Sequence, residues 1–135
     1  MADQRPGDGP AAPPSRYETG LAMRRRVLGA EYVDRALATT DEGARAVQTL
    51  VTEFAWGGIW SRPGLDLRTR SLITLAMLCA IDNPGELRLH VGAAIRNGCT
   101  PDEIRETLLH SMIYLGVPAA LAALAIAKEE LAATG

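Results

Sequence analysis

The chain has 135 residues, enough for one domain with a single core, and 47% of them are hydrophobic although only 4% are aromatic. Its 14 basic and 16 acidic residues give a net charge of −2, and the sequence shows no stripe of basic residues. This balance argues against nucleic acid or an anionic membrane as a partner. Because the first residues hold no apolar signal segment and no run reaches the roughly 18 apolar residues of a membrane span, we expect a cytoplasmic protein.

The N-terminal segment differs in character from the rest of the chain. Residues 1–15 are rich in Pro, Gly and Ala and offer little to bury, which predicts a disordered arm ahead of one domain over residues 16–135. The domain begins with two short predicted helices, 16–28 and 30–39, which Gly29 separates.

A third helix and an unusual loop are predicted next. Asp41 is suited to cap this helix, and we expect the helix to end near Gly57 and Gly58, because adjacent glycines favour departure from helical geometry. The segment 56–64 then holds both tryptophans, three glycines and a proline. Exposed tryptophans are costly, so we expect this loop to fold back over the protein.

Four further helices are predicted in the second half of the chain, and they span 67–81, 84–96, 101–114 and 119–133. Asp66 caps the first of them, Pro84 begins the second, and the third opens with a capping box from Thr100 to Glu103. The helix 67–81 is apolar nearly all round, which indicates a central position. No run alternates with the period of a strand. The sequence therefore predicts an all-α bundle of six to seven helices.

The two cysteines match no metal or redox motif. Cys79 and Cys99 form neither a Cys-x-x-Cys pair nor a zinc pattern, and each lies in an apolar or turn setting. We expect buried, reduced thiols and no metal site.

The two histidines are the first candidates for chemistry. Glu86 and His90 lie four residues apart on one predicted helix, so they share a face. A carboxylate one turn from an imidazole can orient its tautomer and raise its basicity, which gives an acid or base suited to neutral pH. The alternative is a surface ion pair. His110 lies on an otherwise apolar helix, where the alternative to catalysis is a hydrogen-bonded core or interface residue.

Three arginines are candidates for binding an anion. Arg62 lies in the tryptophan-rich segment, and Arg68 and Arg70 lie in the first turn of the following helix. Because a cation at a helix start opposes the macrodipole, another reason for these arginines is needed, and one is recognition of a carboxylate. For Arg68, a salt bridge to Asp66 or Glu53 is the alternative.

Several stretches together carry a family likeness: WGGIWSRPGLD (56–66), RTRSLITLA (68–76), ELRLH (86–90) and LLHSMIYLGVPAA (108–120). With the segment that begins at Arg16, they resemble the carboxymuconolactone decarboxylase family over roughly residues 16 to 132. The resemblance implies an alkylhydroperoxidase-D-like helical fold, usually assembled as a hexamer built from three dimers. It also implies loss of CO2 from 4-carboxymuconolactone, giving β-ketoadipate enol-lactone in the protocatechuate branch of the β-ketoadipate pathway.

Peroxidase relatives of this family carry a Cys-x-x-Cys pair ahead of the histidine that corresponds to His90. Asn83 and Glu86 stand at those positions here, so thiol peroxidase chemistry is not expected. The decarboxylation needs no cofactor, because the departing carboxylate is vinylogous to the lactone carbonyl and the ring accepts the electron pair. The protein must supply a donor at the lactone oxygen and a proton for the carbon.

The roles follow from this chemistry as a hypothesis. We assign His90 as the general acid, Glu86 as the group that sets its protonation and orientation, and His110 as a second donor. Four residues are expected to bind the small lactone substrate, the arginines through its carboxylates and the tryptophan by closing the pocket: Arg62, Arg70, Trp60 and Ser61.

Two alternatives to this function stay open. One is a related lactone decarboxylase or isomerase of the same superfamily with a different substrate, and the other is a non-catalytic helical assembly module. The Ala- and Leu-rich helices offer more apolar surface than one small domain can hide, which indicates a homo-oligomer. Whether a neighbouring subunit contributes to the pocket is left open.

Overall fold

The computed structural model describes residues 9–135, which form seven α-helices and one π-helix. The elements are α1 (Arg16–Leu28), α2 (Ala30–Thr39), α3 (Glu42–Leu50), η1 (Val51–Trp60), α4 (Leu67–Cys79), α5 (Pro84–Arg96), α6 (Pro101–Leu115) and α7 (Val117–Thr134). No strand occurs in this part of the chain, so the predicted all-α class is confirmed. Residues 1–8 of the predicted arm lie outside the described residues, and residues 9–15 are exposed and form no helix.

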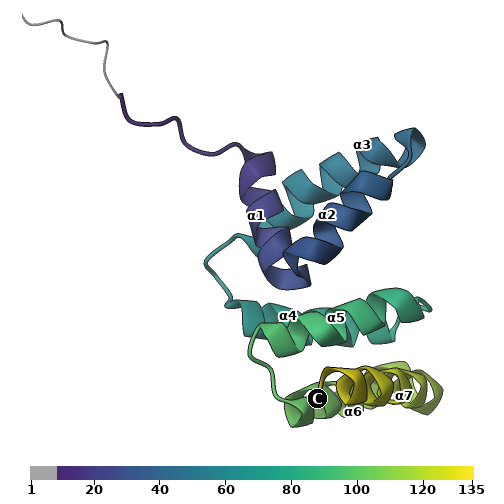
Figure 1. The fold of residues 1–135 in the computed structure, drawn as a ribbon. Helices are drawn as coiled ribbons and strands as arrows, with labels where there is room; N and C mark the ends of the chain where they lie inside the picture. The colour runs from purple at the N-terminus through teal and green to yellow at the C-terminus, as the bar shows by residue number, and fades with distance from the viewer. Residues whose placement is uncertain (1–8) are drawn as a thin grey trace, which may run out of the picture.

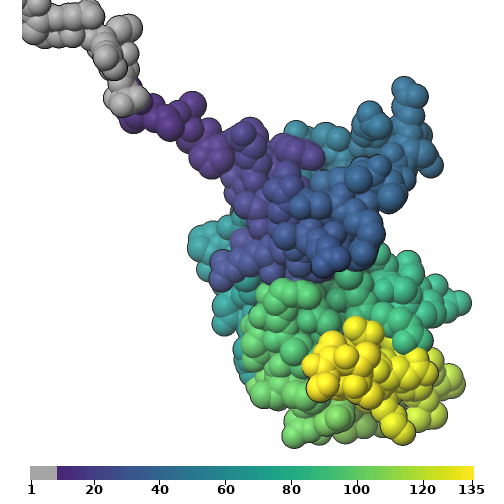
Figure 2. Space-filling view, viewed as in Figure 1, coloured from purple at the N-terminus to yellow at the C-terminus, as the bar shows by residue number. Residues whose placement is uncertain are grey.

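The helices are arranged in three layers (Figure 1). The first layer holds α1, α2, α3 and η1, the middle layer holds α4 and α5, and the last holds α6 and α7. Figure 2 shows the same division on the surface, where the purple and blue N-terminal residues cover one end and the green and yellow residues form the other. No helix in the described range is both long and apolar enough to cross a lipid bilayer.

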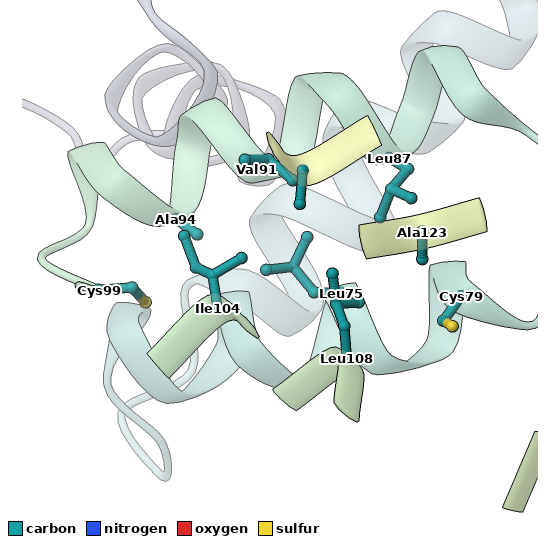
Figure 3. Packing of buried hydrophobic residues seen from close by; sticks show 10 residues of the cluster. Leu75, Cys79, Leu87, Val91, Ala94, Cys99, Ile104, Leu108 and Ala123 are labelled. Carbon is teal, nitrogen blue, oxygen red and sulfur yellow. The ribbon is translucent and has the colours of Figure 1, made fainter. Parts of the chain in front are cut away.

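Buried side chains form two hydrophobic clusters rather than one. The larger cluster lies among α4, α5, α6 and α7, and Leu75, Ile104 and Leu108 are fully buried within it (Figure 3). The smaller cluster joins α1, α2 and η1 to α5 and includes Val27 and Trp56. Because α5 supplies side chains to both clusters, it connects the two ends of the molecule.

Local capping signals set most helix boundaries as predicted. Asp41 and Asp66 each accept a hydrogen bond from the backbone N–H three residues later, at 2.8 and 2.7 Å. Thr100 and Glu103 form the predicted capping box at the start of α6. Gly29, between α1 and α2, has a φ of 92°, a conformation that glycine adopts without strain.

The third helix does not break at Gly57 and Gly58, near which it was predicted to end, and residues 56–60 of the predicted loop are helical. The helix instead continues from α3 into the π-helix η1, which carries both tryptophans and ends at Trp60. The glycine at position 57 serves helix packing, because a Cβ there would collide with the carbonyl oxygen of Arg16 on α1. A Cβ on Gly20 would likewise collide with the carbonyl oxygen of Thr52. These two glycines let the backbones of α1 and η1 approach closely.

The helix predicted to be central, α4, is covered on only part of its circumference. Leu75 is fully buried between α5, α6 and α7, but Ile73 is exposed and Met77 is 64% exposed. An apolar face of α4 is therefore left open by this single chain. Cys79 and Cys99 are free and buried, as predicted.

Candidate active site

A cavity of about 400 Å³ lies where the first layer meets α5. Its polar lining residues are Arg24, Tyr32, Gln48, Thr74, Glu86 and His90. The remaining wall is mostly apolar and includes both tryptophans of the chain, Trp56 and Trp60. The cavity therefore combines polar and titratable groups with an apolar, aromatic wall, as small-molecule sites commonly do.

His90 lies against an aromatic wall. Asn83 caps the start of its helix, and the Asn83 side chain accepts a hydrogen bond from a backbone N–H of the first turn. The His90 side chain is buried, with a residue exposure of 7%, and its ring is nearly parallel to that of Trp56, 6.5 Å away and tilted by 4°. Trp60 lies 6.3 Å from the imidazole and stacks on Trp56 at 5.0 Å. The imidazole is thus largely shielded from solvent.

Glu86 affects His90 through its charge rather than through a direct hydrogen bond. The distance from Glu86 Oε2 to His90 Nε2 is 3.8 Å, which is too long for such a bond. Burial lowers the pKa of the His90 imidazole below its usual value, and the Glu86 carboxylate opposes that change. Burial therefore favours the neutral imidazole, and further negative charge beside it would favour its protonation. Its Nδ1 atom is buried without a hydrogen-bond partner.

Arg24 is a cavity residue that sequence reasoning missed. It is only 6% exposed, and it donates hydrogen bonds to Thr52 Oγ1 at 3.1 Å and to Gln48 Oε1 at 2.8 Å. A signal for it was available, because Arg24 lies one turn from Val27 and Leu28 on the side of α1 that is buried. A charged residue on the apolar side of a helix suggests a functional role.

Only some of the predicted substrate-binding residues reach this cavity. Trp60 lines it. Ser61 instead follows η1 and donates a hydrogen bond to the carbonyl oxygen of Trp56 at 2.7 Å. Arg62 is exposed, and Arg70 donates to the carbonyl oxygen of Arg62 at 3.0 Å, so neither arginine lines the cavity of this single chain.

His110 and Arg68 also lie elsewhere. His110 is exposed on α6 beside Tyr114, with ring centroids 5.5 Å apart, and it lines a separate hollow between α4 and α6. Arg68 forms a salt bridge, but with Glu103 on α6 rather than with either predicted partner. The structure therefore brings together His90, Glu86 and Trp60 and leaves the other predicted site residues outside the cavity.

This arrangement is suited to binding an organic anion and moving a proton. Arg24 provides a buried positive charge, His90 a titratable imidazole, and the stacked tryptophans an apolar surface that excludes water. A proton donor in such a surrounding can act on a carbanion before water does.

Comparisons with known proteins agree with this chemistry. Residues 45–129 match the model of the carboxymuconolactone decarboxylase family. The chain is 45% identical over 114 residues to the 4-carboxymuconolactone decarboxylase of Acinetobacter baylyi, which covers 84% of this chain and 85% of that protein. It is 42% identical over 115 residues to the nitrosuccinic acid decarboxylase of Metarhizium robertsii, with coverages of 85% and 80%. An uncharacterised 15.0 kDa protein of Paracoccus denitrificans is 37% identical over 79 residues, with coverages of 56% and 58%. The chain belongs to the carboxymuconolactone decarboxylase family.

Proposed function

We propose that this protein is a cytoplasmic carboxy-lyase that converts 4-carboxymuconolactone to β-ketoadipate enol-lactone and CO2 in protocatechuate catabolism. The observation that carries the proposal is the buried His90, held against two tryptophans and one turn from Glu86, in a cavity that also contains a buried arginine. The 45% identity to a protein named for this activity supports the choice of substrate. The free thiols Cys79 and Cys99 suit a reducing compartment.

In the proposed reaction, the bond between the ring carbon and the departing carboxylate breaks. Its electron pair enters the ring as a dienolate that extends to the lactone carbonyl, and CO2 leaves. His90 then transfers a proton to the carbanion carbon and regains one from solvent. The negative charge of the bound substrate, together with Glu86, would favour the protonated imidazole that burial alone disfavours.

The apolar wall has a role in the same step. A carboxylate held against Trp56 and Trp60 would lose much of its hydration, whereas neutral CO2 would not be penalised there. The wall would therefore favour departure of CO2 and keep water from the reactive carbon.

Nitrosuccinic acid is a second candidate substrate, supported by the 42% identity to a decarboxylase named for it. It too is a dicarboxylic acid with its own electron acceptor, because the nitro group can take the electron pair as a nitronate. Both candidates need the same help from the protein, namely an anion-binding group and a proton donor. Assay of the purified protein with each substrate decides between them.

The decisive test generates 4-carboxymuconolactone from protocatechuate in the cuvette and follows its conversion on addition of the protein. Replacing His90 with Ala should lower turnover by roughly 100-fold or more if His90 is the general acid. Near-normal turnover in that variant would reject the assignment. Replacing His110 with Ala tests the predicted second donor, and unchanged turnover there would remove His110 from the mechanism.

We further propose that the protein is a homo-oligomer, with the hexamer of three dimers that the family resemblance implies. Two apolar surfaces support this. One lies on α4, α6 and α7, where Met77 is 64% exposed and Tyr114 is 75% exposed, and the other lies on α3 and η1, where Phe54 is 53% exposed. The predicted roles of Arg62, Arg70, Ser61 and His110 would require such a neighbour to bring them to a cavity. Sedimentation equilibrium tests the assembly.

A further inference from the structure

Arg24 is a buried cation with no acidic partner among the described residues. Its hydrogen-bond acceptors, the Thr52 hydroxyl and the Gln48 amide oxygen, are both neutral, and its Nε atom is buried without a partner. A buried charge is normally paired, because its desolvation is costly unless an opposite charge offsets it. Within residues 9–135, therefore, no salt bridge neutralises this positive charge in the cavity wall.

The groups around Arg24 hold its side chain in place without neutralising its charge. The Thr52 hydroxyl donates to the carbonyl oxygen of Gln48 at 2.8 Å, so its oxygen is oriented to accept from Arg24. Because a guanidinium has only donors, the Gln48 atom facing it is the amide oxygen, and the amide N–H groups of Gln48 are left to donate elsewhere. Arg24 and Gln48 both line the cavity. The cavity wall therefore offers the guanidinium and the Gln48 amide as hydrogen-bond donors, and the guanidinium carries a positive charge.

We propose that Arg24 binds the carboxylate that the substrate retains, and that this residue makes the cavity selective for dicarboxylic acids. The proposal rests on the proposed decarboxylation for the identity of the substrate. The retained carboxylate supplies the negative charge that Arg24 lacks, while the departing carboxylate is left to the apolar wall and His90. This role was assigned on sequence grounds to Arg62 and Arg70, which do not line the cavity.

The chain contains its own probe for the test. Trp56 and Trp60 are its only two tryptophans, and both line the cavity, so intrinsic fluorescence reports on occupancy directly. Sodium succinate, a dicarboxylate that cannot undergo the reaction, is titrated into the wild-type protein at two ionic strengths. Saturable quenching that weakens with added salt is expected, because the interaction is between charges.

Two substitutions separate charge from packing. Arg24→Met keeps an unbranched apolar stem and removes the charge, and it should weaken succinate binding at least tenfold and abolish the salt dependence. Arg24→Lys restores the charge without the planar fork and should recover part of the affinity. The matched control is Arg25→Gln on the next residue of α1, which is exposed, pairs with Asp34 at 2.6 Å and should bind succinate as the wild type does.

Thermal unfolding of the same variants excludes a purely structural role. Because Arg24 has no acidic partner, Arg24→Met should unfold at a temperature equal to or above that of the wild type. The proposal is overturned if wild-type protein shows no succinate quenching, if Arg24→Met binds succinate equally well, or if binding is lost only together with a collapse in unfolding temperature. An inert enzyme that binds succinate through Arg24 would refute the decarboxylation and leave the Arg24 assignment intact. A protein whose decarboxylase activity and succinate binding are unchanged by Arg24→Met would refute the Arg24 assignment and leave the decarboxylation intact.

Discussion

Substitution of Gly20 by Ala tests the close crossing of α1 and η1. In a helix interior this change normally stabilises by about 1 kcal/mol, because alanine has the higher helix propensity. Here the added Cβ would overlap the carbonyl oxygen of Thr52 and lie 2.8 Å from the backbone nitrogen of Gly57. Backbone atoms cannot rotate away as a side chain can, so the overpacking should cost close to the upper end of the usual range of about 1–3 kcal/mol.

The net expectation for Gly20→Ala is a loss of about 1–2 kcal/mol, or a fall of roughly 4–8 °C in the unfolding midpoint. Gly92→Ala on α5 is the matched control, since its Cβ would meet only Glu130 Oε1 at an ordinary 3.5 Å. That variant should gain about 0.5–1 kcal/mol. Urea denaturation at one protein concentration measures the free energy of unfolding of both variants. Both changes are Gly to Ala within a helix, so the contribution of helix propensity cancels when the two variants are compared. A Gly20→Ala protein as stable as the wild type, with an unchanged m-value, would refute the close crossing.

Three further predictions concern the site, a cap and the thiols. Because the Glu86 carboxylate raises the pKa of His90, Glu86→Gln should lower that pKa, so kcat/KM should begin to fall with rising pH at a lower pH than in the wild type; an unmoved pH profile would contradict this. Thr100→Ala removes the side-chain acceptor at the start of α6 and should cost about 1 kcal/mol in urea denaturation, whereas an unchanged midpoint would count against the cap. Burial raises the pKa of Cys79 and Cys99, so both thiols should react with a colorimetric disulfide reagent only on unfolding, and rapid reaction of the native protein would show otherwise.

The fold was predictable where its signals are local. The caps at Asp41, Asp66 and Thr100 act within three residues, so the sequence alone locates these helix starts. Gly57 was misread because its reason for being glycine is the backbone of Arg16, which lies far away in the sequence. No local rule distinguishes a glycine that ends a helix from one that admits a neighbouring helix.

The candidate site divides in the same way. Glu86 and His90 were found because residues four apart on a helix share a face. The local signal for Arg24, its place beside Val27 and Leu28 on α1, did not reveal the cavity, because the cavity forms from six elements and one acceptor for the guanidinium lies 28 residues away. Arg62 was favoured by its place in the tryptophan-rich segment and Arg70 by its place at a helix start, but neither residue lines the cavity.

The crossing of α1 over η1 has a consequence for how this scaffold can diversify. α1 precedes residues 45–129, the part that matches the family model, and it carries Arg24, whereas His90 is built into α5 between the two clusters. On the proposed roles, ligand choice and proton delivery would reside on different helices with different supports. Changes in the amino-terminal helix would then alter which organic acid is bound, while the proposed proton donor on α5 would keep its position.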